Sequence, residues 1–377
     1  MASYLWIDQA AALKPHAAAL SQQSVVALDT EFMRSDTFYP ILGLLQVASQ
    51  DTVLLIDGID AVCMSIAAEM LLNENQQPTW VLHSCAEDLE VALNQWDALP
   101  NRLVDTQLAA AHLGHPRQMS LQNLLAVELG VHLPKDETRS DWCKRPLSSA
   151  QLSYAAGDVA HLLPLWEKLS HTLHERDRMS WFTEDCAKLI AKARRITPFD
   201  QQYLSFHDAW QMKDKSLAVL QALAAWREQV AREQNKPRGF ILKDPVLYAI
   251  AERLPKNATA LAAIPDIPLS AVRKHCDELL HIIHATEIVP ELARPARPLT
   301  NRQRELLRQL KSWLETQAKA LNLPVELLAG RKQLVHLLRF WAGEEPESHE
   351  DWVGWRQMLL EPNMKRIAKA FQSDLVE

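Results

Sequence analysis

The stretch VVALDTEF, residues 25–32, combines a buried-strand pattern with two carboxylates. The apolar run before Asp29 is typical of a strand inside a sheet. Residues i and i+2 of a strand point to the same face, so Asp29 and Glu31 are expected side by side. Burying two such charges together is costly unless cations neutralise them. The pair therefore suggests Mg²⁺ or Mn²⁺, although an isolated Asp-x-Glu pattern is more often a solvated strand end.

Other segments of the first half extend this strand into a sheet. Short apolar runs predict three more strands, at LLQVA (44–48), TVLLI (52–56) and TWVLH (79–83). Helical patterns follow at residues 86–96, 106–113, 120–130 and 148–175, and Asp105 and Ser148 are suited to N-cap two of these helices. Antiparallel strands followed by alternating strands and helices predict one mixed α/β sheet.

The second half has a leucine-rich helical pattern instead. Two linker-like stretches, residues 196–202 and 290–300, divide it into two pieces of about 85 residues, which is a small-domain size. The pieces resemble a duplication, because eight residues recur at an offset of 87 positions. The pairs are Leu220 and Leu307, Leu223 and Leu310, Trp226 and Trp313, Ala231 and Ala318, Arg232 and Lys319, Pro237 and Pro324, Leu247 and Leu334, and Ile250 and Leu337.

Charge is distributed unevenly between the two halves. The net charge is −7, but residues 1–190 hold 12 Lys+Arg against 24 Asp+Glu, whereas residues 191–377 hold 28 against 23. The halves therefore carry −12 and +5. An acidic half joined to a basic half fits a cation-using site beside a nucleic-acid-binding region. Chance asymmetry of a solvated surface is the plain alternative.

Composition favours a cytoplasmic protein. Hydrophobic residues make up 48% and charged residues 23%, as in soluble globular chains. Neither a signal peptide nor a membrane span is expected from the sequence pattern. The five cysteines are widely spaced and contain no CxxC pair, which favours reduced thiols over a zinc site.

Two more segments contain carboxylates in a functional-looking context. HSCAEDLE (83–90) places Asp88 in the first turn of a helix after a strand, although Glu87 and Glu90 are equally close alternatives. YAAGD (154–158) places Tyr154 and Asp158 one helical turn apart, on one face. Each segment alone is better explained as ordinary helix surface.

The three acidic segments together change that assessment. Two-metal phosphoryl chemistry needs acidic ligands from separate segments to hold two ions about 4 Å apart. Asp158 could bind a metal while Tyr154 orients the attacking water. The chain has nine glycines and no GxxxxGK[ST] motif, so a P-loop enzyme and a nucleotide cofactor are not expected.

ALDTEF (27–32), HSCAEDLE (83–90) and YAAGDV (154–159) resemble the three exonuclease motifs of the DEDD superfamily, tyrosine subclass. Within that superfamily the whole chain is most similar to the bacterial ribonuclease D family. Supporting segments are YPILGLLQVAS (39–49), LVDTQLAA (103–110) and SDWCKRPLS (140–148). Gly157 departs mildly from the family pattern, where a larger residue usually precedes the last aspartate, but it removes no ligand.

The resemblance implies a fold, a site and a reaction. The fold would be an α/β ribonuclease-H-like exonuclease domain, residues 1–195, with a mixed sheet flanked by helices, followed by two small all-α HRDC domains at 204–286 and 296–377. The reaction would be 3′→5′ hydrolysis of RNA releasing 5′-mononucleotides, with tRNA precursors as substrates and two divalent ions, Mg²⁺ or Mn²⁺, as cofactors. The catalytic metal ligands would be Asp29, Glu31, Asp88 and Asp158. Tyr154 would be the fifth catalytic residue and would position the attacking water.

Several nearby residues are candidate substrate contacts. Phe32 and Met33 could wedge against the terminal base, or could equally pack in the core. Lys135, Arg139 and Arg145 could grip phosphates, with a solvated loop as the close alternative.

Two rival functions remain at this stage. One is a DNA exonuclease of the same chemistry, since sequence does not show which residue reads a 2′-hydroxyl. The other is a non-catalytic nucleic-acid-binding protein. Exact substrates, the preferred metal and the oligomeric state also stay open, as does whether the helical domains bind RNA or protein.

Overall fold

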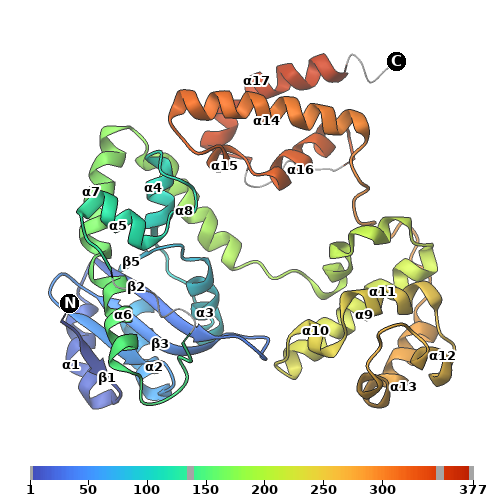
Figure 1. Ribbon diagram of the computed structural model, residues 1–377, viewed down its shortest axis with the longest axis horizontal. Coiled ribbons are helices and arrows are strands. Elements are labelled where there is room, and N and C mark those ends of the chain that lie inside the picture. The colour runs from blue at the N-terminus through green and yellow to red at the C-terminus, as the bar shows by residue number, and fades with distance from the viewer. Residues whose placement is uncertain (1–2, 134–139, 345–351, 373–377) are drawn as a thin grey trace. The chain divides into compact units, whose positions relative to one another are not determined.

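The computed structural model describes residues 3–133, 140–344 and 352–372 (Figure 1). The chain forms two compact units. The first contains residues 1–33, 42–194 and 299–377, and the second contains residues 34–41 and 195–298. Each unit joins segments that are separate in the sequence, so the units do not correspond to consecutive domains. The domain limits expected at 1–195, 204–286 and 296–377 stay predictions.

The first unit contains a mixed sheet, as expected, and this sheet has six strands where the sequence patterns predicted four. Its strands are β1 (Leu5–Ile7), β2 (Val25–Met33), β3 (Ile41–Ala48), β4 (Val53–Asp57), β5 (Thr79–Leu82) and β6 (Leu103–Asp105). Their order is β1-β4-β3-β2-β5-β6. The β3–β4 pair is antiparallel, while β1–β4, β2–β5 and β5–β6 are parallel. Strand β2 is therefore an interior strand with neighbours on both sides.

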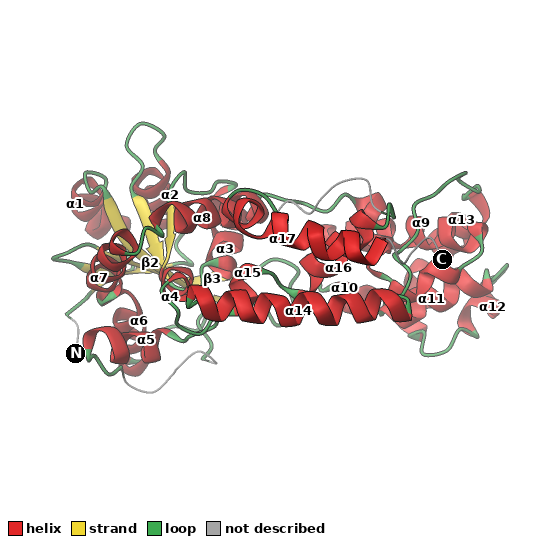
Figure 2. Cartoon of the chain, turned by 90° about the horizontal axis from the view of Figure 1, so that it is seen from above, coloured by secondary structure: helices red, strands yellow, loops and turns green. Residues whose placement is uncertain are grey.

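Helices cover both faces of this sheet (Figure 2). Helices α1 (Ala10–Leu20), α2 (Ala61–Leu72) and α3 (Ala86–Trp96) contribute to the core on one face. The core on the other face includes residues of α4 (Thr106–His112), α5 (Leu121–Leu129), α6 (Ser149–Ala160), α7 (Leu162–Glu175) and α8 (Met179–Ala193). Alternate β2 residues enter the two cores, Ala27 on one side and Val26 and Leu28 on the other, which fixes the register of the strand.

Local signals in the sequence account for most of these elements. Asp105 caps α4 by accepting the backbone N–H of Leu108, and Ser148 forms a capping box with Gln151 at the start of α6. The turn between the antiparallel strands β3 and β4 is closed by a hydrogen bond from Ser49 N to Thr52 O of 2.9 Å. The sequence patterns did not identify β1, α1, α2, β6 or α8. Two of these are three-residue strands, too short for a periodic signal.

The second unit contains the first helical module, which is built around a core of its own. It contains the short 3₁₀ helices η1 (Phe199–Ser205) and η2 (His207–Gln211), and the helices α9 (Asp214–Glu233), α10 (Arg238–Ile241), α11 (Asp244–Arg253), α12 (Ala258–Ala262) and α13 (Leu269–Ala285). Buried leucines and isoleucines of α9, α11 and α13 form the centre of that core.

Residues 299–377 form a second helical module, which belongs to the first unit. Its helices are α14 (Asn301–Leu321), α15 (Val325–Leu328), α16 (Arg331–Trp341) and α17 (Trp355–Gln372). The first three start 87 residues after α9, α10 and α11, since 301 − 214, 325 − 238 and 331 − 244 all equal 87. The repeat seen in the sequence therefore corresponds to a repeated three-helix frame.

Candidate active site

Strand β2 carries the first two carboxylates of the site. Residues 26–28 are fully buried, and the strand becomes partly exposed from Asp29 onward. Asp29 and Glu31 share the face of Ala27 by strand alternation. The apolar half of β2 thus anchors the strand in the core, and its second half presents both carboxylates at the end of the buried region.

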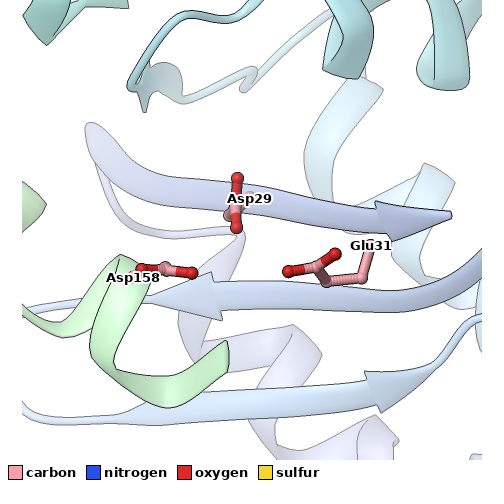
Figure 3. Close-up of side chains that lie close together, drawn as sticks. All are labelled: Asp29, Glu31 and Asp158. Carbon is pink, nitrogen blue, oxygen red and sulfur yellow. The ribbon is translucent and has the colours of Figure 1, made fainter. Parts of the chain in front are cut away.

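Asp158 joins them from helix α6 (Figure 3). The carboxylates of Asp29, Glu31 and Asp158 each offer an oxygen, and these oxygens lie within 4.8 Å of one another. The capping box at Ser148 sets the start of α6, and buried alanines at 155 and 156 let the helix approach the sheet closely. Two segments about 130 residues apart in sequence therefore converge on one acidic cluster.

Asp88 lies in the first turn of α3 and is 8% exposed. The hydroxyl of Thr30 donates a 2.6 Å hydrogen bond to its Oδ1. Glu87 and Glu90, which the sequence left as alternatives, are both exposed. The structure therefore singles out Asp88 as the carboxylate of this segment that is coupled to β2.

Burial and neighbouring groups perturb the ionisation of Asp29 and Asp88. Burial raises the pKa of Asp29 well above its usual value, and the charges of Asp88, Asp158 and Glu31 raise it further. Burial likewise raises the pKa of Asp88 to about 6, against the lowering effect of the Thr30 hydrogen bond. Oxygen donors crowded this closely suit hard divalent cations, which would relieve the repulsion. The donor set thus fits divalent metal ions.

Tyr154 lies one turn before Asp158 on α6 and is partly buried. Burial raises the pKa of its phenol well above the usual value, and the neighbouring charges of Asp158 and Glu31 act in the same direction. Its ring packs near the buried ring of Trp142, with centroids 6.1 Å apart. Tyr154 therefore stays protonated and is held in place beside the acidic cluster.

Two polar residues that the sequence did not assign to the site lie beside it. Thr30 points to the opposite face from Asp29 and Glu31, and strand alternation alone could have assigned it there. Its bond to Asp88 depends on how α3 packs, which no sequence pattern encodes. Gln46 is fully buried on β3, and its Nε2 lies 3.4 Å from Asp29 Oδ2, while its Oε1 has no hydrogen-bond partner.

The structure places the expected substrate contacts Phe32, Met33 and Arg145 in different surroundings. Phe32 packs against the core on one face of the sheet, and Met33 packs against the core on the other, with both partly exposed. Arg145 is committed elsewhere, because its guanidinium pairs with Asp57 and donates to the carbonyl oxygens of Gly43 and Trp142. This geometry gives Arg145 a structural role and not that of a free phosphate contact. Residues 135 and 139 lie outside the described part of the chain.

Comparison with known proteins agrees with this geometry. A family profile described as 3′-5′ exonuclease matches residues 4–174, and an HRDC domain profile matches residues 216–283. Ribonuclease D of Pseudomonas paraeruginosa is 39% identical over 93% of this chain and 94% of its own length. Ribonuclease D of Escherichia coli is 31% identical over 92% and 93%.

A solved structure extends the similarity to the whole fold. The Escherichia coli RNase D crystal structure superposes with a TM-score of 0.89 at 30% identity, covering 98% of this chain and 99% of that one. The mixed sheet, its flanking helices and the helical C-terminal region are therefore family features. The chain belongs to the ribonuclease D family of metal-dependent 3′→5′ exoribonucleases.

Proposed function

We propose that this chain removes nucleotides one at a time from RNA 3′ ends, releasing 5′-mononucleotides. The observation that carries this proposal is the acidic cluster, in which oxygens of Asp29, Glu31 and Asp158 lie within 4.8 Å of one another. Asp88 completes the set through its coupling to Asp29. These four residues would hold two divalent ions, and Mg²⁺ or Mn²⁺ are the best-suited metals for all-oxygen sites.

In this scheme the metal ligands, Tyr154 and Thr30 have different roles. Two bound ions would supply Lewis acidity at the phosphate and stabilise charge on the leaving 3′ oxygen. Asp29 and Glu31 lie on an interior strand, which places both carboxylates on one face of the sheet. Tyr154 keeps its proton and would hold a water molecule by its hydroxyl, oriented for in-line attack. Thr30 keeps Asp88 in place beside β2 through its hydrogen bond.

The substrate class rests on the family and on charge. The solved relative is described as an exoribonuclease involved in structured RNA processing, which favours structured RNA as substrate here too. Transfer-RNA precursors with 3′ extensions are the class that we propose. The helical half carries +5, which suits an RNA partner.

We propose a cytoplasmic location for this reaction. Across the residues that the structure describes, none of the helices combines the length and apolarity needed to cross a bilayer.

The experiment is single-turnover digestion of a tRNA with extra 3′ residues, in Mg²⁺ and separately in Mn²⁺. A DNA oligomer and an RNA oligomer of the same sequence are digested in parallel. Asp29→Asn should lower the rate by several orders of magnitude, while Tyr154→Phe should lose about 10²–10⁴-fold. Asp51→Asn, an exposed turn carboxylate, is the matched control and should leave the rate unchanged. Normal turnover by Asp29→Asn would remove this residue from the site, and faster digestion of DNA would overturn the RNA assignment.

A further inference from the structure

Residues 34–41, which connect β2 to β3, pack within the second unit. The side chain of Asn235 holds them there, because its Oδ1 accepts the backbone N–H groups of Phe38 and Tyr39, each at 3.0 Å. Asp36 contributes an exposed ion pair with Lys236 at 3.4 Å. The connection is therefore bound by specific contacts and does not simply cross solvent.

The ring of Phe38 occupies a prepared aromatic site on this unit. The guanidinium carbons of Arg232 and Arg238 lie 5.1 and 5.0 Å from its centroid. Phe38 also packs against a small apolar cluster of Val230, Ala231 and Ile241. Cationic groups at these distances from a ring face attract it, so Phe38 is held by both charge and apolar contact.

Both arginines are fixed independently of Phe38. Glu228 is 1% exposed and accepts hydrogen bonds from Arg232 Nε at 2.7 Å and from Arg238. Although burial would raise the pKa of Glu228, the two arginines lower it, so its charge is kept. Asn235 has a backbone φ of +48°, the left-handed region that asparagine tolerates better than most residues. The site on the first helical module is thus preorganised for an aromatic residue whose own backbone N–H and that of the next residue are both accepted by Asn235.

We propose that the first helical module is a positioning device for the exonuclease reaction. Through Asn235, Arg232 and Arg238 it fixes residues 34–41, and through the continuous chain it restrains the end of β2 that carries Asp29 and Glu31. Arg34 follows Glu31 by three residues, with Phe32 and Met33 between them. This inference rests on the proposed function, because it assumes that the β2 carboxylates are the catalytic ones.

The physical reason is the sensitivity of the reaction to small displacements. A misplacement of about 1 Å in a catalytic group can cost on the order of 10²-fold in rate. The last residues of β2 are only partly buried, so core packing restrains them less than it restrains residues 26–28. A bound connection on their C-terminal side supplies the missing restraint.

The test uses the full-length Asn235→Gly variant. Glycine keeps the left-handed backbone without strain and removes only the acceptor of the two N–H groups. Hydrogen exchange of the peptide covering residues 34–41 should speed up, which reports release of the connection. Single-turnover cleavage of a short single-stranded RNA in Mg²⁺ should slow by about tenfold or more, with little change in KM or in RNA affinity. Phe38→Ala should act in the same way, and the double variant should lose little beyond either single variant.

Two further variants separate positioning from general stability. Phe199 also lies against Arg232, with the guanidinium carbon 5.3 Å from its ring centroid, but it belongs to η1 and not to the connection. Phe199→Ala should therefore leave the exchange of residues 34–41 and the cleavage rate unchanged. Asn235→Asp keeps an acceptor oxygen and should restore most of the rate.

Each remaining outcome decides against the inference. Faster exchange of residues 34–41 with an unchanged cleavage rate shows that β2 needs no such restraint. Unchanged exchange in Asn235→Gly shows that Asn235 does not hold the connection. A fall in RNA affinity at constant rate identifies this surface as an RNA contact instead. If the unmodified chain itself fails to cleave RNA in Mg²⁺, the proposed function is wrong, and the inference fails with it.

Discussion

The two helical modules share a frame and differ in how they are used. In each, a corner with an asparagine in the left-handed region follows the first long helix: Asn235 with φ +48° after α9 and Asn322 with φ +50° after α14, again 87 positions apart. In the first module the side chain of Asn235 binds the connection at Phe38 and Tyr39. In the second module the equivalent corner is bound through its backbone carbonyls. Arg178 of the exonuclease region donates hydrogen bonds to Leu321 O and Asn322 O.

The two modules differ more in the charged residues near their corners than in their helix frame. Glu228 is buried between two arginines, whereas Glu315, at the equivalent position, is exposed. The second module is instead attached through Asp185 of α8, which is 5% exposed and bonds to Arg356, His112 and the indole of Trp355. The duplicated sequence preserves the helix frame because leucines fill its core. The residues that attach each module lie outside the core that the leucines fill. The two copies therefore differ in these residues.

The largest expected effect is the loss of the second module's attachment in Asp185→Ala. This change leaves the guanidinium of Arg356, which is 8% exposed, without its carboxylate partner. Breaking a buried pair in this way costs about 3–5 kcal/mol. Urea unfolding should show that loss, while Glu167→Ala, at an exposed α7 position, should stay within about 0.5 kcal/mol. A loss below about 1 kcal/mol for Asp185→Ala would mean that apolar packing alone attaches the module.

A smaller effect is expected from Glu228→Gln in the first module. The amide keeps the shape but loses charged hydrogen bonds, at a cost of about 1–3 kcal/mol. The cost is lower than for Asp185 because the Arg238 side chain is 46% exposed and water can solvate it. Glu315→Gln, the equivalent exposed position, is the matched control and should have almost no effect. Equal effects on calorimetric unfolding would contradict the difference between the modules.

Acid should weaken the attachment of the second module. Burial would raise the pKa of Asp185, but the hydrogen bonds from His112 and Arg356 outweigh it and lower the pKa to about 2. The charged carboxylate therefore stabilises the folded state above its ordinary pKa of 3.8, and this contribution disappears as pH falls from about 4 to about 2. It amounts to roughly 2 kcal/mol. The difference in unfolding free energy between the unmodified chain and Asp185→Asn should shrink over that range, and a constant difference would refute the assignment.

The smallest effect should come from Asn322→Gly. Here the corner acts through backbone carbonyls, and glycine retains both of them and the left-handed conformation. The melting temperature should barely change, corresponding to less than about 0.5 kcal/mol. Because the Asn322 side chain also lies against Gly114, a clear destabilisation would show that this side-chain contact matters.

The acidic site was largely readable from the chain. The alternation of β2 predicted that Asp29 and Glu31 share a face, and helical spacing predicted the pairing of Tyr154 with Asp158. Asp88 could be chosen over Glu87 and Glu90 only by resemblance, until burial and the Thr30 hydrogen bond distinguished it. Arg145 looked like a phosphate contact because its partner, Asp57, lies 88 residues away in sequence.

The sequence by itself determined the mixed sheet, the helical second half, the 87-residue repeat and the positions of the acidic motifs. Each of these depends on residues close in sequence, where apolar period and capping act directly. Only the tertiary structure decided that Phe38 docks on the corner at Asn235 and that Asp185 pairs with Arg356. Phe38 and Asn235 are 197 positions apart in the sequence, and Asp185 and Arg356 are 171 positions apart. Such pairs form because folding brings complementary charge and shape together, and no local pattern records which partners will meet.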